Sequence, residues 1–87
     1  MRVIEFTNLE REDVQIFYIR KYSAIAVIEL PQNTKNLSIN FSIEMDPLGQ
    51  KQITLKINDS TDYPLLPLRK SIIEYITNLD KEGKLPC

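Results

Sequence analysis

Apolar and polar residues alternate strictly along residues 37–45. The apolar positions are Leu37, Ile39, Phe41, Ile43 and Met45. A period of two is typical of a strand that buries one face and exposes the other. The alternation returns over residues 52–58, and the residues between the two stretches include Pro47 and Gly49, which supply the backbone angles of a tight turn. We therefore expect residues 37–45 and 52–58 to form a hairpin.

Residues 14–30 follow a different pattern, because their apolar side chains fall on both parities. A strand that is apolar on both faces requires cover on both sides. We expect two strands here, residues 14–19 and 22–30, joined by a tight turn at Arg20 and Lys21. Two alternatives stay open: one long strand from Val14 to Leu30, or a helix from Asn8 to Lys21, which early acids and late bases would favour.

The two ends of the chain predict further elements. Residues 1–6 indicate a short strand, and residues 7–10 have the spacing of a capping box, which predicts a single helical turn. Residues 66–82 have helical periodicity, and Gly83 and Pro86 are suited to end a helix. The apolar positions of this helix recur every three or four residues: Leu65, Leu68, Ile72, Ile76 and Leu79.

The order of these elements predicts an α+β fold with a single domain over residues 1–87. Short connections favour antiparallel neighbours, so we expect a meander-like antiparallel sheet of about five strands with one C-terminal helix packed on one face. The helix would be about 24 Å long and the longest strands near 30 Å, so the two elements match in length. One helix covers one face, so sheet curvature or another molecule must cover the other.

The composition excludes several classes of function. The chain has 87 residues with 11 basic and 12 acidic side chains, and this balance provides no overall field for nucleic acid or for an anionic membrane surface. It shows no signal-peptide pattern and no apolar run near the ~18 residues of a membrane span. Cys87 is the only cysteine and cannot form an internal disulfide, so we expect a cytoplasmic protein.

The sequence offers little for catalysis or metal binding. It contains no histidine, so the commonest general base is absent and Cys87 has no histidine to activate it. Residues 58–62 are rich in oxygen ligands, but they lack the glycine and the distal glutamate of a calcium loop and also suit a turn before a helix. We expect no enzymatic activity, no metal site and no cofactor.

The two-sided apolar segment is the remaining candidate for function, because large exposed apolar patches are unusual on monomers. The candidate interface residues are Phe17, Ile19, Tyr22, Ala24, Ile25, Ala26 and Val27. We expect a non-enzymatic protein-interaction or structural module that binds itself as a homodimer, face to face or edge to edge, or serves another protein as an accessory subunit. The alternative is a single-strand nucleic-acid-binding module that uses the outer face of the sheet, where aromatic side chains could stack on bases.

Overall fold

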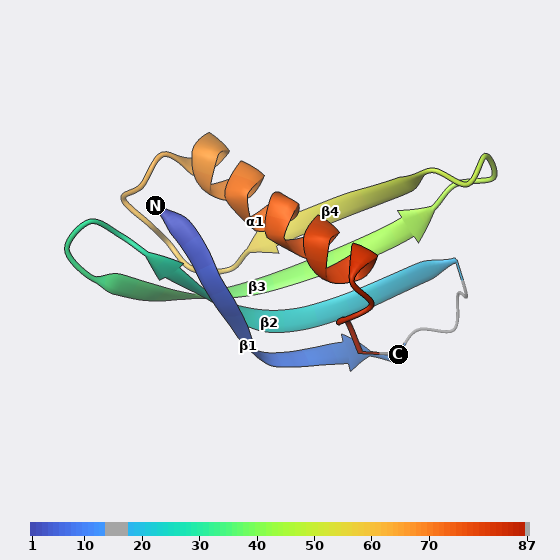
Figure 1. Cartoon of the computed structure of the whole chain (residues 1–87), viewed down its shortest axis with the longest axis horizontal. Helices are drawn as coiled ribbons and strands as arrows, with labels where there is room; N and C mark the ends of the chain where they lie inside the picture. The colour runs from blue at the N-terminus through green and yellow to red at the C-terminus, as the bar shows by residue number, and fades with distance from the viewer. Residues whose placement is uncertain (14–17, 87) are drawn as a thin grey trace.

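The computed structural model describes residues 1–13 and 18–86, which form an antiparallel sheet with one helix on one face (Figure 1). The elements are β1 (Arg2–Glu12), β2 (Ile19–Glu29), β3 (Thr34–Met45), β4 (Lys51–Ile57) and α1 (Leu65–Lys81). The strands lie in the order β1-β2-β3-β4, and each is antiparallel to its neighbour. The predicted fold class is confirmed, with four strands in the described part of the chain instead of about five. Within these ranges, no helix combines the length and the apolar character that a membrane crossing requires.

The hairpin of β3 and β4 forms where the alternation predicts it. One carboxylate oxygen of Asp46 accepts hydrogen bonds from the backbone N–H groups of Leu48, at 2.9 Å, and Gln50, at 2.8 Å. Gly49 has a φ of 83°, a left-handed conformation that costs glycine little. The side chain of Asp46 and the glycine together hold the turn in one conformation.

The N-terminal strand is longer than predicted. β1 runs through residues 7–10, so the single helical turn predicted there is wrong. Its pairing with β2 shifts register between Val3 and Glu5 and again between Thr7 and Glu10, and Asn8 has a φ of 51°. Such bulges insert residues that break the alternation of the two faces. The strand is therefore regular in its hydrogen bonding over only short stretches, which hides it from a search for a period of two.

Arg20 and Lys21 lie inside β2, where they pair with Ile43 and Ser42 of β3. The tight turn predicted at these two residues is therefore wrong. The alternative helix from Asn8 to Lys21 is wrong as well, because both of its ends lie in strands. Most of the predicted strand 14–19 falls on residues 14–17, which lie outside the described residues, as does the start of the alternative long strand.

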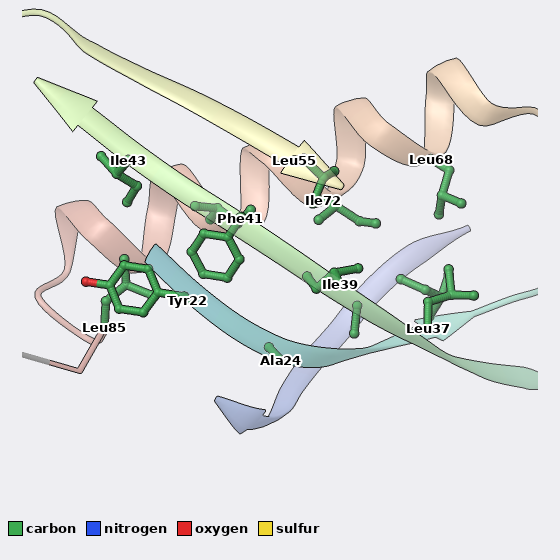
Figure 2. Close-up of a cluster of buried hydrophobic side chains, with 13 residues drawn as sticks. Tyr22, Ala24, Leu37, Ile39, Phe41, Ile43, Leu55, Leu68, Ile72 and Leu85 are labelled. Atoms are coloured by element: carbon green, nitrogen blue, oxygen red, sulfur yellow. The ribbon is translucent and has the colours of Figure 1, made fainter. Parts of the chain in front are cut away.

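The core lies between the inner face of the sheet and α1 (Figure 2). Alternate residues of β2 and β3 point into this layer, and the helix contributes its buried stripe. The fully buried larger side chains are Tyr22, Ile28, Leu37, Ile39, Leu68, Ile72 and Ile76. The ring of Phe6, on the edge strand β1, lies 4.7 Å from that of Tyr75 on the helix. Both edge strands approach α1, so the sheet curves around the helix (Figure 1).

The helix is shorter than the inner face that it covers. Its 17 residues span about 25 Å, whereas the 12 residues of β3 span about 40 Å, so the predicted match in length does not hold. At the start of the helix, Tyr63 and Leu68 close over Leu37 and leave a cavity of only about 10 Å³. At its end, the β3–β4 hairpin continues beyond the last turn of α1 (Figure 1). The inner face therefore has one closed end and one open end.

Candidate functional site

The open end of the inner face contains the largest cavity found among the described residues, with a volume of about 620 Å³. Its walls come from the start of β2, the end of β3 and the start of β4. The residues with inward-facing side chains or turn positions are Tyr18, Arg20, Ile43, Met45, Pro47 and Lys51. We call this cavity the hairpin-end pocket.

Strand register explains why these residues meet. Arg20 lies opposite Ile43, and Met45 lies opposite Lys51, so all four side chains point to the same face of the sheet. The backbone N–H of Met45 donates to the carbonyl oxygen of Tyr18 at 3.0 Å, which extends the pairing past the end of β2. The pocket is thus the continuation of the core face beyond the end of the helix.

Asp80, in the last turn of α1, fixes the helix to the wall of this pocket. Its carboxylate accepts from Arg20 at 3.0 Å and from Lys51 at 2.7 Å. Burial alone would raise the pKa of Asp80, but the hydrogen bonds from Lys51 and Arg20 outweigh burial and lower this pKa below its ordinary value. Arg20 also donates to the hydroxyl of Tyr22 at 3.3 Å, and that hydroxyl donates to the carbonyl oxygen of Pro86 at 3.1 Å. These bonds join the helix end and the C-terminal segment to the sheet.

The pocket combines an apolar floor with apolar side chains that face solvent. Ile43 forms part of the floor and is buried. Tyr18 and Met45 beside it are 48% and 45% exposed, and Leu48 at the tip of the hairpin is 86% exposed. Exposed apolar residues gathered around a cavity are typical of a binding surface, whereas the same residues scattered singly would need no explanation.

The charged residues around the pocket carry both signs. Arg20 and Lys51 are the cations, and Glu44 and Asp46 lie beside them as acids. Among the residues the structure describes, no group of three or more potential ligands could hold a metal ion. An apolar floor with charges of both signs at its margin suits an apolar side chain that is itself flanked by charged groups.

Comparison with known proteins shows where this chain belongs. One protein-family model matches residues 1–81, which include all four strands and the whole of α1. The chain belongs to the BB-0187 family. Neither curated proteins nor solved structures give a match to it. In this family member the matched range contains the hairpin-end pocket and Asp80, so both are within the part of the chain that defines the family.

The structure divides the interface residues predicted from the sequence of this family member. Tyr22, Ala24 and Ala26 are buried in the core beneath the helix, so their side chains are not available to a partner. Ile19, Ile25 and Val27 have the opposite parity and lie partly buried on the outer face. Phe17 lies outside the described residues.

Polar side chains surround the outer apolar residues. Ile25 has Thr7 and Ser38 as its cross-strand neighbours, and Val27 has Glu5 and Asn36. An antiparallel sheet can expose one such polar face to water without further cover. The two-sided pattern of residues 14–30 therefore reflects a few apolar residues on a largely polar face.

The charges of the outer face disfavour nucleic acid. By register, its acidic residues outnumber its basic ones; the acids are Glu5, Glu10, Glu12, Glu29 and Glu44, and the bases are Arg2, Lys21 and Lys56. The rings of Phe6, Tyr22 and Phe41 stack on one another within the core. The paired strand residues therefore offer the outer face neither an excess of cations nor an aromatic platform, which single-strand binding needs.

Sequence reasoning does not find the hairpin-end pocket, and Leu48 is the signal that could have found it. The sequence pattern places Met45, Leu48 and Lys51 in strands or in a turn and gives them no further role. A leucine at the tip of a polar turn has no intramolecular core to enter, so its presence there indicates a contact outside the hairpin.

Proposed function

We propose that the protein is a non-enzymatic protein-interaction module that works as a homodimer through its hairpin-end pocket. The observation that carries this proposal is the apolar inner face that continues past the end of α1, where Tyr18 and Met45 are exposed. A second copy would supply the cover that the helix is too short to provide. We place this dimer in the cytoplasm, because a single cysteine fits a reducing compartment.

The mixed charges around the pocket favour a second copy as the partner. A two-fold axis brings the same surface of both chains together, so each chain's Arg20 and Lys51 can face the other chain's Glu44 and Asp46. A nucleic acid or a strongly charged peptide would instead need a surface of one sign. The surface is therefore electrostatically complementary to itself.

The open end is small, and this limits the affinity. The molecule measures 43 × 24 × 24 Å, and the contact would lie at one end of the long axis. Standard interfaces bury about 800 Å² on each partner, and contacts below this size are usually weak. We expect a dimer with a dissociation constant in the range of about 10 µM or higher.

Light scattering on a size-exclusion column, over a series of protein concentrations, tests the proposal. The average mass should rise from monomer toward dimer as the concentration increases. Met45→Lys adds a cation beside Arg20 and Lys51 in the contact, so this variant should remain monomeric. Leu66→Lys is the matched control, since Leu66 is also exposed but lies at the start of the helix, and it should dimerise like the wild type.

Two results would contradict the proposal. A wild-type chain that stays monomeric at the highest concentration would exclude the homodimer. A dimer that Ile25→Lys dissociates but Met45→Lys does not would place the interface on the outer face of the sheet.

A further inference from the structure

We infer that Leu48 of one chain enters the hairpin-end pocket of the second chain, and that the second chain's Leu48 enters the pocket of the first. This inference rests on the proposed homodimer and specifies how the two chains meet. It assigns Leu48 as the anchor of the interface and the pocket around Ile43 and Met45 as its receptor.

Leu48 is presented to solvent on a backbone that is already fixed. Its own N–H is bound by the carboxylate of Asp46, and the N–H of Gly49 donates to the backbone oxygen of Asp46 at 2.9 Å. A side chain on a preformed turn loses little backbone freedom when it binds. With 86% of its surface exposed, Leu48 makes almost no use of its apolar area within its own chain.

The pocket is suited to receive such a side chain. Its volume of about 620 Å³ lies in the range of preformed ligand pockets and far exceeds the needs of one leucine. Ile43 supplies a rigid apolar floor, and Met45 is flexible enough to pack against an entering group. The remaining volume leaves room for Pro47 of the entering turn.

Symmetry completes the argument. Leu48 does not line the pocket of its own chain, because the turn directs it away while Met45 and Lys51 border the cavity. A projecting side chain and a cavity side by side on one surface become mutually complementary when a two-fold axis passes between them. This contact closes after two copies, so it predicts a dimer and no longer assembly.

Cysteine cross-linking tests this arrangement directly. In a Cys87→Ser background, chains with Leu48→Cys and chains with Met45→Cys are mixed in a glutathione redox buffer, and the Met45→Cys chains carry an affinity tag so that the products differ in mass. Disulfides between the two kinds of chain should form about tenfold faster than those between Leu66→Cys chains and Met45→Cys chains, because contact raises the effective thiol concentration. In light scattering, Leu48→Ala should weaken the dimer about tenfold, whereas Leu66→Ala should leave it unchanged.

The outcomes separate this inference from the proposed homodimer. If the wild type dimerises but the disulfide between positions 48 and 45 is not enriched, the insertion of Leu48 is excluded and the homodimer stands. A dominant disulfide between two Leu48→Cys chains would show the tips in contact with each other and would also exclude insertion. If the wild type is monomeric at all concentrations, both the homodimer and the insertion fail.

Discussion

Asp80 shows how one side chain can secure the end of a helix. Its carboxylate is only 13% exposed and joins α1 to both β2 and β4 through Arg20 and Lys51. Charged hydrogen bonds in a partly buried setting are stronger than exposed ion pairs. The pair of Arg2 and Glu29 is largely exposed, so we expect it to contribute little to stability.

Asp80→Asn should lower the free energy of unfolding by about 1–2 kcal/mol at pH 7, because it replaces two charged hydrogen bonds by weaker ones. Urea denaturation followed by circular dichroism measures this difference. Glu82→Gln is the matched control, since Glu82 forms an exposed pair with Lys84, and its effect should stay within about 0.5 kcal/mol.

The contribution of Asp80 should depend on pH in a defined direction. Because its pKa is lowered in the folded state, its stabilising effect is complete above the ordinary carboxyl value and is lost as the pH falls below about 4 through the folded value. The difference in stability between wild type and Asp80→Asn should therefore shrink toward acid pH. An unchanged difference between pH 7 and pH 3 would show that the charge of Asp80 does not stabilise the fold.

At the scale of elements, regular patterns are predictable and irregular ones are not. The β3–β4 hairpin and α1 follow from alternation and from a helical period, which depend on local sequence alone. β1 escapes prediction beyond residue 6 because its register shifts place Asn8 and Leu9 out of phase. Arg20 and Lys21 resemble a turn in sequence, but pairing with β3 keeps them in a strand.

The helix gives the clearest test at this scale. Leu68 and Ile72 are buried against the sheet, so Leu68→Asp or Ile72→Asp would place an unpaired charge in the core and should unfold the protein. Leu66→Asp, on the exposed side of the same helix, should change the free energy of unfolding by less than about 0.5 kcal/mol. Circular dichroism and thermal melting distinguish the variants, and a folded Ile72→Asp protein would refute the position of the helix.

The hairpin-end pocket could not be predicted from the sequence, because it arises from a difference between two lengths. The order of residues along one strand does not show where the helix above it will end. That position depends on the bonds of Asp80 to Arg20 and Lys51, which lie far apart along the chain. The pocket is therefore a property of tertiary structure and not of any single element.

At the scale of the whole molecule, the distribution of charge argues against the predicted alternative function. The outer face carries more acids than bases, and Phe6, Tyr22 and Phe41 lie together in the core. Fluorescence anisotropy with labelled random single-stranded oligonucleotides should therefore detect no binding at low salt. Binding that weakens steeply as salt is added would revive the nucleic-acid-binding alternative.

The position of α1 after all four strands has a consequence for biosynthesis. The strands leave the ribosome before the helix that covers their apolar face, and at about 5–20 residues per second the stretch from Asn58 to Lys81 takes about 1–5 s to follow. During that interval the nascent sheet has no lid over Ile39 and Phe41. The growing chain must therefore stay unpaired with its neighbours on the same message, and slow codons between β4 and α1 would lengthen the time in which it can aggregate.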